Sequence, residues 1–272
     1  MADQRFVFLI GAARSGTKFM RDTIAVSHDV AAVPFDINYV WRHGNEQCPH
    51  DELTADHIDA KTANHIRGTV QRLAMKGRST PAPIILEKTV SNTLRMDMIR
   101  RVFPEAEFIR LERNGLDVVE SSFRQWTLPV DRSYLLNKIR YFPLREWRYG
   151  LWFVKNVVSG TNDPPIWGPR YEGIEADLTS LSVAETCAIQ WRKSVMSSRL
   201  SSADDTISIR YEDLGATSTV EDLVTVLGLS DPSRVLHQFN ESFKRISSWP
   251  GAIPTENREA CEQIVDSVLD SG

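Results

Sequence analysis

The chain alternates short segments rich in apolar residues with longer stretches in which apolar residues recur at helical spacing. The short segments, expected to be strands of a buried sheet, lie at residues 6–10, 30–33, 84–86, 107–111 and 206–210. The helical stretches begin at Thr17 and continue at residues 55–75, 91–102, 116–126, 182–200, 219–227, 232–240 and 256–269. Because strands and helices alternate, we predict an α/β fold with a central parallel sheet of about five strands and helices on both faces.

Residues 127–180 interrupt this alternation. They contain Trp147, Trp152 and Trp167 and a stretch rich in Pro and Gly at 163–170. We expect a helical and loop insertion here, within a single domain that spans residues 1–272, because no repeat, low-complexity tract or linker divides the chain. The aromatic residues of this region either line a substrate pocket or belong to the core.

Composition narrows the function. The chain has 272 residues and a formal net charge of −4, which argues against nucleic-acid binding but allows a local cluster of cations around a small anion. The three cysteines are far apart and form no CxxC pair, which indicates free thiols in a reducing compartment. We find no signal-peptide pattern and no run of 18 apolar residues, so we expect a cytoplasmic protein without a membrane span.

A candidate phosphate-binding loop, Gly-Ala-Ala-Arg-Ser-Gly-Thr-Lys at residues 11–18, joins the first strand to the first helix. The backbone N–H groups of such a turn and the positive end of the helix attract an anion to one spot. Small residues let the anion approach closely, and Arg14, Thr17 and Lys18 can donate hydrogen bonds to a phosphate. A strand–helix turn without any ligand is the alternative.

The loop is not a Walker A motif, which ends in Gly-Lys-Ser/Thr. Here Gly16 is followed by Thr17 and then Lys18. Neither the lysine that curls over nucleotide phosphates nor the hydroxyl that holds Mg²⁺ is therefore in its place. This departure counts against a P-loop kinase or NTPase.

A second candidate site, Arg-Asn-Gly-Leu-Asp-Val-Val-Glu-Ser at residues 113–121, follows the fourth strand. Arg113 lies at the turn and Ser121 two helical turns later, on roughly the same side of the helix. Ligands of open parallel sheets bind at this edge of the sheet. The segment alone could be an ordinary charged helix, but two such segments after the first and fourth strands are more specific than either one.

These segments resemble the sulfotransferases that use 3′-phosphoadenosine 5′-phosphosulfate (PAPS). Arg14-Ser-Gly-Thr17 resembles the family's 5′-phosphosulfate loop, in the arginine form of protein-tyrosine sulfotransferases and many bacterial members, and Arg113 with Ser121 resembles the pair that holds the 3′-phosphate. The resemblance implies a P-loop NTPase-like three-layer fold. It also implies that Arg14, Ser15, Gly16, Thr17 and Lys18 bind PAPS or its product PAP and that Arg14 is catalytic. Lys18 departs from the more usual second threonine.

Two further residues are candidates for the transfer itself. Lys88, in a Glu-Lys-Thr segment just past the third strand, matches a lysine that contacts the sulfuryl group in related enzymes; without the resemblance it would be a solvated surface lysine. Asp36, after the second strand, is the candidate general base for the acceptor proton, near the place of a catalytic glutamate in some relatives. An Asx turn is the alternative for Asp36, and His28 and His43 are competing bases.

The resemblance extends to the C-terminal third of the chain. Tyr211, in Arg-Tyr-Glu-Asp-Leu after the last strand, is similar to a residue on the cofactor side of the site, although a packing role is equally open. Lys244 and Arg245 match a late basic loop that closes over the 3′-phosphate.

We therefore predict an enzyme, a PAPS-dependent sulfotransferase that needs no metal and modifies a hydroxyl or amine of a small-molecule or glycan acceptor. A P-loop kinase or NTPase and a non-catalytic nucleotide-binding protein are the alternatives. The resemblance is thin over residues 36–80 and 127–180, the stretches that would select the acceptor, so the sequence specifies neither the acceptor nor the oligomeric state.

Overall fold

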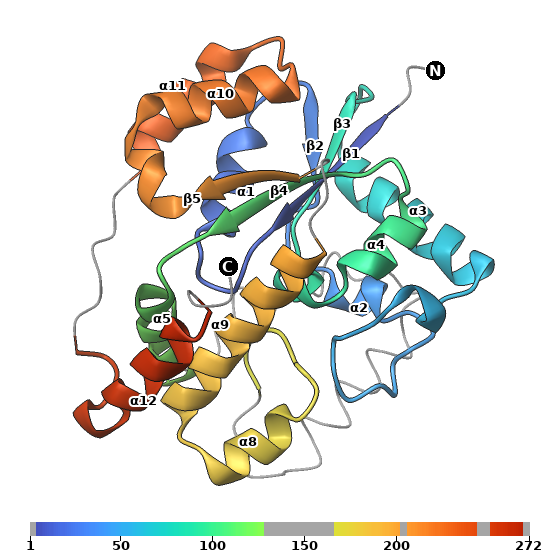
Figure 1. The fold of residues 1–272 in the computed structure, drawn as a ribbon. Helices are drawn as coiled ribbons and strands as arrows, with labels where there is room; N and C mark the ends of the chain where they lie inside the picture. Colours follow the sequence, from blue (N-terminus) through green and yellow to red (C-terminus); the bar gives the residue numbers. More distant parts are fainter. Residues whose placement is uncertain (1–3, 128–165, 202–205, 244–250, 269–272) are drawn as a thin grey trace.

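The fold is built on a five-stranded parallel sheet, seen in a computed structural model that describes residues 4–127, 166–201, 206–243 and 251–268 (Figure 1). The sheet order is β2-β3-β1-β4-β5, and every neighbouring pair is parallel. The strands are β1 Arg5–Ile10, β2 Val30–Ala32, β3 Ile84–Glu87, β4 Glu107–Glu112 and β5 Thr206–Arg210. The five predicted strands and the parallel sheet are confirmed, with bounds that differ by one residue at most.

Helices cover both faces of the sheet, so the predicted three-layer arrangement is confirmed. Phe6 and Phe8 of β1 pack on one face against α2 Asn38–Trp41, α3 Ala60–Met75 and α4 Met96–Val102. Val7 and Leu9 point to the other face, where α1 Thr17–Ile24, α10 Thr217–Leu227 and α11 Pro232–Ser242 lie (Figure 1). Both faces of β1 are therefore buried, which explains its uninterrupted apolar run.

A third helical cluster lies beside the sheet. It consists of α5 Gly115–Thr127, α9 Val183–Leu200 and α12 Thr255–Asp266, which share a core that also includes Ala12 of the first loop (Figure 1). Helix α9 begins with a capping box between Ser182 and Glu185, and α8 Ile174–Ser180 precedes it. This cluster therefore fixes α5, the helix that carries Ser121.

Two helices that the sequence predicts as continuous are broken in the structure. The stretch 55–75 divides into a 3₁₀ turn, η1 Ala55–His57, and α3, because Ile58 is extended and Asp59 caps α3 by accepting a hydrogen bond from the Thr62 N–H at 2.7 Å. The stretch 91–102 likewise divides into η2 Val90–Leu94 and α4. The prediction that residues 36–55 are irregular is wrong at α2, and a 3₁₀ turn, η4 Tyr211–Gly215, follows β5.

The predicted insertion at 127–180 falls largely outside the described residues, and so do Trp147 and Trp152. Trp167 is half-buried, and its carbonyl accepts a hydrogen bond from Gln190 at 2.9 Å. The insertion and the single-domain organisation stay predictions. Within the described ranges, no helix is long and apolar enough to cross a membrane.

Asp51 is a buried carboxylate that ties the loop after β2 to its surroundings. Its two oxygens accept five hydrogen bonds or ion pairs of 2.9–3.1 Å, from Asn38, Arg42, Ser91, Arg95 and the backbone N–H of Arg170. Burial alone would raise the pKa of Asp51, but the charge of Arg95, the Arg170 N–H and the charge of Arg42 lower it to about 2. The segment that follows Asp36 is therefore anchored on a charge inside the protein.

We expect Asp51→Asn to lower the free energy of unfolding by about 3–5 kcal/mol at pH 7, because it leaves Arg42 and Arg95 buried without their shared partner. Urea denaturation measures this loss. Glu105→Gln, which removes the partly exposed pair with Arg67, is the control and should cost no more than about 1 kcal/mol. An Asp51→Asn variant as stable as this control contradicts the prediction.

The same carboxylate predicts a pH dependence. Because the folded-state pKa of Asp51 lies below its value of 3.8 in an ordinary environment, its contribution is fully present above pH 4. About 2 kcal/mol of stability should be lost as the pH falls from about 4 to about 2. Unfolding of the wild type should show this loss, and Asp51→Asn should lack it.

Candidate functional site

The candidate site lies at the carboxyl ends of the three central strands. β1 pairs with β3 on one edge and with β4 on the other, so the connection from β3 to β4 crosses over β1. Chain connections on opposite sides of a strand leave a crevice at its carboxyl end, where ligands of such sheets bind. The loops that follow β1, β3 and β4 carry the predicted residues Arg14, Lys88 and Arg113 to this crevice.

The loop after β1 has an unusual backbone. Arg14 has a φ of +71° and Gly16 a φ of +98°, both in the left-handed region. Ser15 closes the turn: its backbone N–H and its hydroxyl both donate to the carbonyl of Ala12, at 3.1 and 2.7 Å. Thr17 then begins α1, whose first N–H groups have no partner within the helix. The loop therefore offers backbone donors at the positive end of a helix, as the sequence predicts.

Gly16 is required by a close approach as well as by its φ angle. A Cβ atom there would lie 2.8 Å from the ring of Tyr211. The guanidinium of Arg113 lies over the Tyr211 ring, with its central carbon 4.5 Å from the ring centre. The buried Tyr211 thus packs between the first loop and Arg113, which gives it a packing role in this site.

The two predicted phosphate sites meet through a direct hydrogen bond. Arg14 donates from Nε to the hydroxyl of Ser121 at 2.9 Å, and Arg113 donates from Nη1 to the carbonyl of Arg14 at 3.4 Å. Segments about 100 residues apart are therefore side by side, with Ser121 and Arg113 both buried. The structure places these three residues in one cluster.

Positive charge accumulates in this cluster. Partial desolvation lowers the pKa of Arg14, and the positive charges of Arg113 and Arg124 lower it further. Within the described part of the chain, no carboxylate forms an ion pair with Arg14, and Asp117 lies 3.7 Å from Arg113. Such an arrangement favours an anion that brings the missing negative charge.

Lys88 and Asp36 form an ion pair at the carboxyl end of the sheet, where the candidate site lies. Nζ of Lys88 lies 2.7 Å from Oδ1 of Asp36, and the Lys88 side chain is only 7% exposed. The alternative of a solvated surface lysine is therefore wrong. Asp36 retains 25% of its side-chain exposure, so its carboxylate can be reached by a ligand.

The two histidines that compete with Asp36 lie elsewhere. His28 precedes β2 and therefore lies at the amino end of that strand, whereas the candidate site lies at the carboxyl ends. It contacts Arg234. His43 follows α2 and stacks on His65 of α3, with ring centres 3.8 Å apart. Neither contacts Lys88 or Arg14, and the assignment of Asp36 as the general base stays a prediction.

The remaining predicted binding residues are Lys18, Lys244 and Arg245. Lys18 forms an exposed pair with Asp22 at 2.8 Å on α1. Lys244 and Arg245 lie outside the described residues. Their roles stay predictions. Among the residues that the structure describes, no group of three or more His, Cys, Asp or Glu side chains could hold a metal ion.

Sequence reasoning missed Glu87, the last residue of β3. Its side chain is buried next to Lys88, and burial raises its pKa to about 7. The only signal in the sequence was a carboxylate at the end of a predicted strand, and such a residue is normally exposed.

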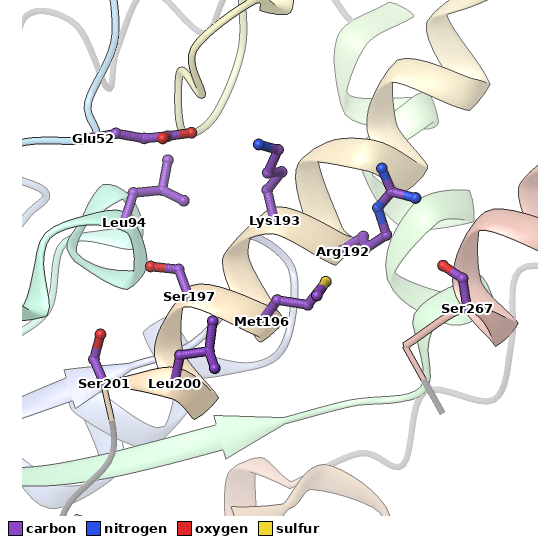
Figure 2. Close-up of a pocket in the computed structure, with 9 residues that line it drawn as sticks. All are labelled: Glu52, Leu94, Arg192, Lys193, Met196, Ser197, Leu200, Ser201 and Ser267. Atoms are coloured by element: carbon purple, nitrogen blue, oxygen red, sulfur yellow. The ribbon is translucent and has the colours of Figure 1, made fainter. Parts of the chain in front are cut away.

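A separate depression of about 670 Å³ runs along α9 (Figure 2). Figure 2 shows Lys193 and Ser197 of α9 on the side of Glu52 and Leu94, and Arg192 and Met196 on the side of Ser267. Its lining residues are Glu52, Leu94, Arg192, Lys193, Met196, Ser197, Leu200, Ser201 and Ser267, none of which is a predicted site residue. The depression is therefore distinct from the cluster around Arg14.

Comparison with known proteins identifies the family. The family model described as "Sulfotransferase family" matches residues 7–152, which contain Arg14, Lys88, Arg113 and Ser121. This chain belongs to the sulfotransferase family. No curated protein sequence matches this sulfotransferase at a significant level.

Solved structures share the fold of this sulfotransferase. A sulfotransferase from Alicyclobacillus acidocaldarius is 14% identical with a TM-score of 0.52, and the match covers 99% of this chain and 94% of that one. The sulfotransferase STF9 from Mycobacterium avium is 10% identical with a TM-score of 0.54, and the match covers 100% of this chain and 77% of that one. Together with the five-stranded sheet, these likenesses establish the P-loop-like fold that the sequence predicts.

The backbone of Arg14 predicts an unusual response to substitution. Because a left-handed φ costs a non-glycine residue about 1–3 kcal/mol, Arg14→Gly should be more stable than Arg14→Ala by about 1 kcal/mol. At Asn64, exposed in the middle of α3, the order should reverse, since glycine is about 1 kcal/mol worse than alanine in a helix. Denaturant unfolding of the four variants tests this. The same order at both positions contradicts the left-handed conformation of Arg14.

Proposed function

We propose that this sulfotransferase moves the sulfuryl group of PAPS to a hydroxyl or amine of a small-molecule or glycan acceptor. The observation that carries the proposal is the Arg14–Ser121 hydrogen bond, which joins two anion-binding segments into one site. A donor with phosphates at both ends of its ribose needs two such segments. The three free cysteines support a reducing, cytoplasmic location as part of this proposal.

The residues present fit such a donor. The loop from Arg14 to Lys18 holds the 5′ end through backbone N–H groups and the start of α1. Arg113 and Ser121 hold the 3′-phosphate, and Tyr211 packs beneath Arg113 on the adenosine side. The proposal also retains the predicted roles of Lys244 and Arg245. The absence of a carboxylate partner for Arg14, among the described residues, leaves its charge available to the donor.

The chemistry requires one bond to form and one to break at sulfur. The acceptor oxygen or nitrogen bonds to sulfur while the bond from sulfur to the phosphate oxygen breaks, and its electron pair leaves with PAP. Arg14 and Lys88 neutralise the negative charge that grows on the leaving and sulfuryl oxygens. These positioned cations therefore stabilise the transition state without a metal ion.

Asp36 takes the proton that the acceptor loses. Its partial exposure leaves it open to an acceptor, and its contact with Lys88 keeps it beside the group that is transferred. As the proton arrives, the Lys88–Asp36 pair weakens, which frees the Lys88 ammonium to follow the sulfuryl group.

Ligand-induced stabilisation tests the donor class. We expect PAP at 100 times its dissociation constant to stabilise the fold by about 2.7 kcal/mol and to raise the melting temperature by several degrees. Thermal unfolding with PAP, and separately with ATP and Mg²⁺, provides the measurement. A shift with Mg·ATP alone indicates a kinase or NTPase and contradicts the proposal; no shift with either ligand also contradicts it. Binding of PAP without transfer to any acceptor indicates the non-catalytic alternative.

Selectivity between PAP and 5′-AMP tests the second segment. Both ligands carry the 5′-phosphate, but only PAP carries the 3′-phosphate. Ser121→Ala and Arg113→Ala should therefore weaken PAP binding about 10–100-fold and AMP binding less, since for AMP only their contacts with Arg14 are lost. Calorimetric titration measures both affinities, with Arg101→Ala, exposed on α4, as the control. Equal losses for PAP and AMP would falsify the assignment of the 3′-phosphate.

A further inference from the structure

Glu87 receives three hydrogen bonds although it is buried. Trp41 donates from its indole N–H at 3.4 Å, Thr89 from its hydroxyl at 2.5 Å and Asn92 from its amide at 2.7 Å. The side chain is 1% exposed, and a carboxylate in such a place is costly unless donors surround it. The transfer chemistry proposed above does not use Glu87, so its burial beside Lys88 needs another account.

Thr89 connects Glu87 to the loop that carries Asp36. The Thr89 hydroxyl has one proton, and donating it to Glu87 leaves the oxygen free to accept. It accepts the backbone N–H of Ile37 at 2.9 Å. Ile37 directly follows Asp36 and is fully buried, so this N–H has to be satisfied inside the protein.

The two ends of the Lys88–Asp36 pair are therefore fixed by one network. Lys88 follows Glu87 in the chain, and Asp36 precedes Ile37. We propose that Glu87 is a positioning residue for the transfer step, which through Thr89 and the backbone of Ile37 holds Asp36 against Lys88. This inference rests on the proposed function and assigns Glu87 no contact with the donor or acceptor.

The network responds to protonation. Burial raises the pKa of Glu87 to about 7, against the hydrogen bond from Thr89 and with support from the negative charge of Asp36. The other charges that face it are Lys88 and Arg95. Above pH 7 the carboxylate accepts from all three donors, and charge-assisted bonds of this kind are about twice as strong as neutral ones.

A protonated Glu87 can also be accommodated. Its acidic proton needs an acceptor, and Oδ1 of Asn92 is buried without a hydrogen-bond partner. Rotation of the Asn92 amide by half a turn presents this oxygen to the carboxyl group. The positioning of Asp36 should therefore weaken as the pH falls through 7, because the hold on Thr89 weakens, without unfolding of the protein.

Substitution of Thr89 tests the connection. Thr89→Val removes the hydroxyl, whereas Thr89→Ser keeps it. We expect Thr89→Val to lower kcat about tenfold or more and Thr89→Ser to stay near the wild type, since small misplacements of reacting groups are costly. The assay follows release of sulfate from labelled PAPS with water as acceptor, a step in which Asp36 accepts a proton of the water. The dissociation constant of PAP should change less than twofold in both.

Two controls separate positioning from general destabilisation. Leu223→Ala, in α10 on the other face of the sheet, lowers stability without touching the network and should retain kcat. Glu87→Gln mimics the protonated state, so its kcat should be low and should lack the rise near pH 7 that the wild type shows.

The outcomes separate this inference from the proposed function. Wild-type protein that neither binds PAP nor releases sulfate overturns both. Wild-type protein that does both, together with a Thr89→Val variant of normal kcat or a Glu87→Gln variant with an unchanged pH profile, overturns the positioning role alone.

Discussion

The central position of β1 is the constraint on which the site depends. β1 is buried on both faces and paired on both edges, with Phe8 opposite Glu87 of β3 and Ile10 opposite Arg110 of β4. A shift of one residue would exchange the two buried faces, so this register is fixed. The register therefore fixes where β3 and β4 end relative to the loop of Arg14. Lys88 and Arg113 directly follow these two strands.

The two ends of the site are held by different means. The backbone holds the end that we propose to bind the donor, where a strained loop and the start of a helix present N–H groups and Arg14 donates to Ser121. Buried polar side chains hold the end of Asp36 and Lys88, with Glu87 and Thr89 behind the pair and Asp51 anchoring the loop beyond it. A backbone cradle suits a ligand of constant shape, whereas a side-chain network can vary with the acceptor.

The sequence was sufficient to predict the sheet and the strand–helix loop at residues 11–18. The strands are apolar runs with sharp polar borders, and the residues of the loop at 11–18 are contiguous, so local patterns reveal both. The position of Lys88 after a strand and the family resemblance both indicated the crevice, whereas its pairing with Asp36 was not predicted. The breaks at Ile58 and Arg95 were missed because helical periodicity continues through them. Capping by Asp59 is a local contact with Thr62, whereas the buried pairing of Arg95 depends on tertiary contacts.

The burial of Glu87 was not predicted for a related reason. A carboxylate at the end of a strand is usually exposed, and nothing local shows that Trp41, Thr89 and Asn92 converge on it. Buried polar networks join residues through space, so pattern analysis of one sequence does not reveal them. Tyr211 is an intermediate case, since its position after the last strand was informative and its contact with Gly16 was not.

That contact between Gly16 and Tyr211 has a consequence for the order of folding. The glycine comes near the start of the chain and the tyrosine late, on the 3₁₀ turn after the edge strand β5. During synthesis the first loop emerges long before the ring that packs against it, and Arg113 gains its aromatic support only when β5 docks. A nascent or truncated chain without β5 and the following turn thus has the loop but lacks the Tyr211 ring that packs against it. If the proposed function holds, nucleotide affinity arises only when the last strand is added, and a protein with an incomplete sheet does not bind the donor.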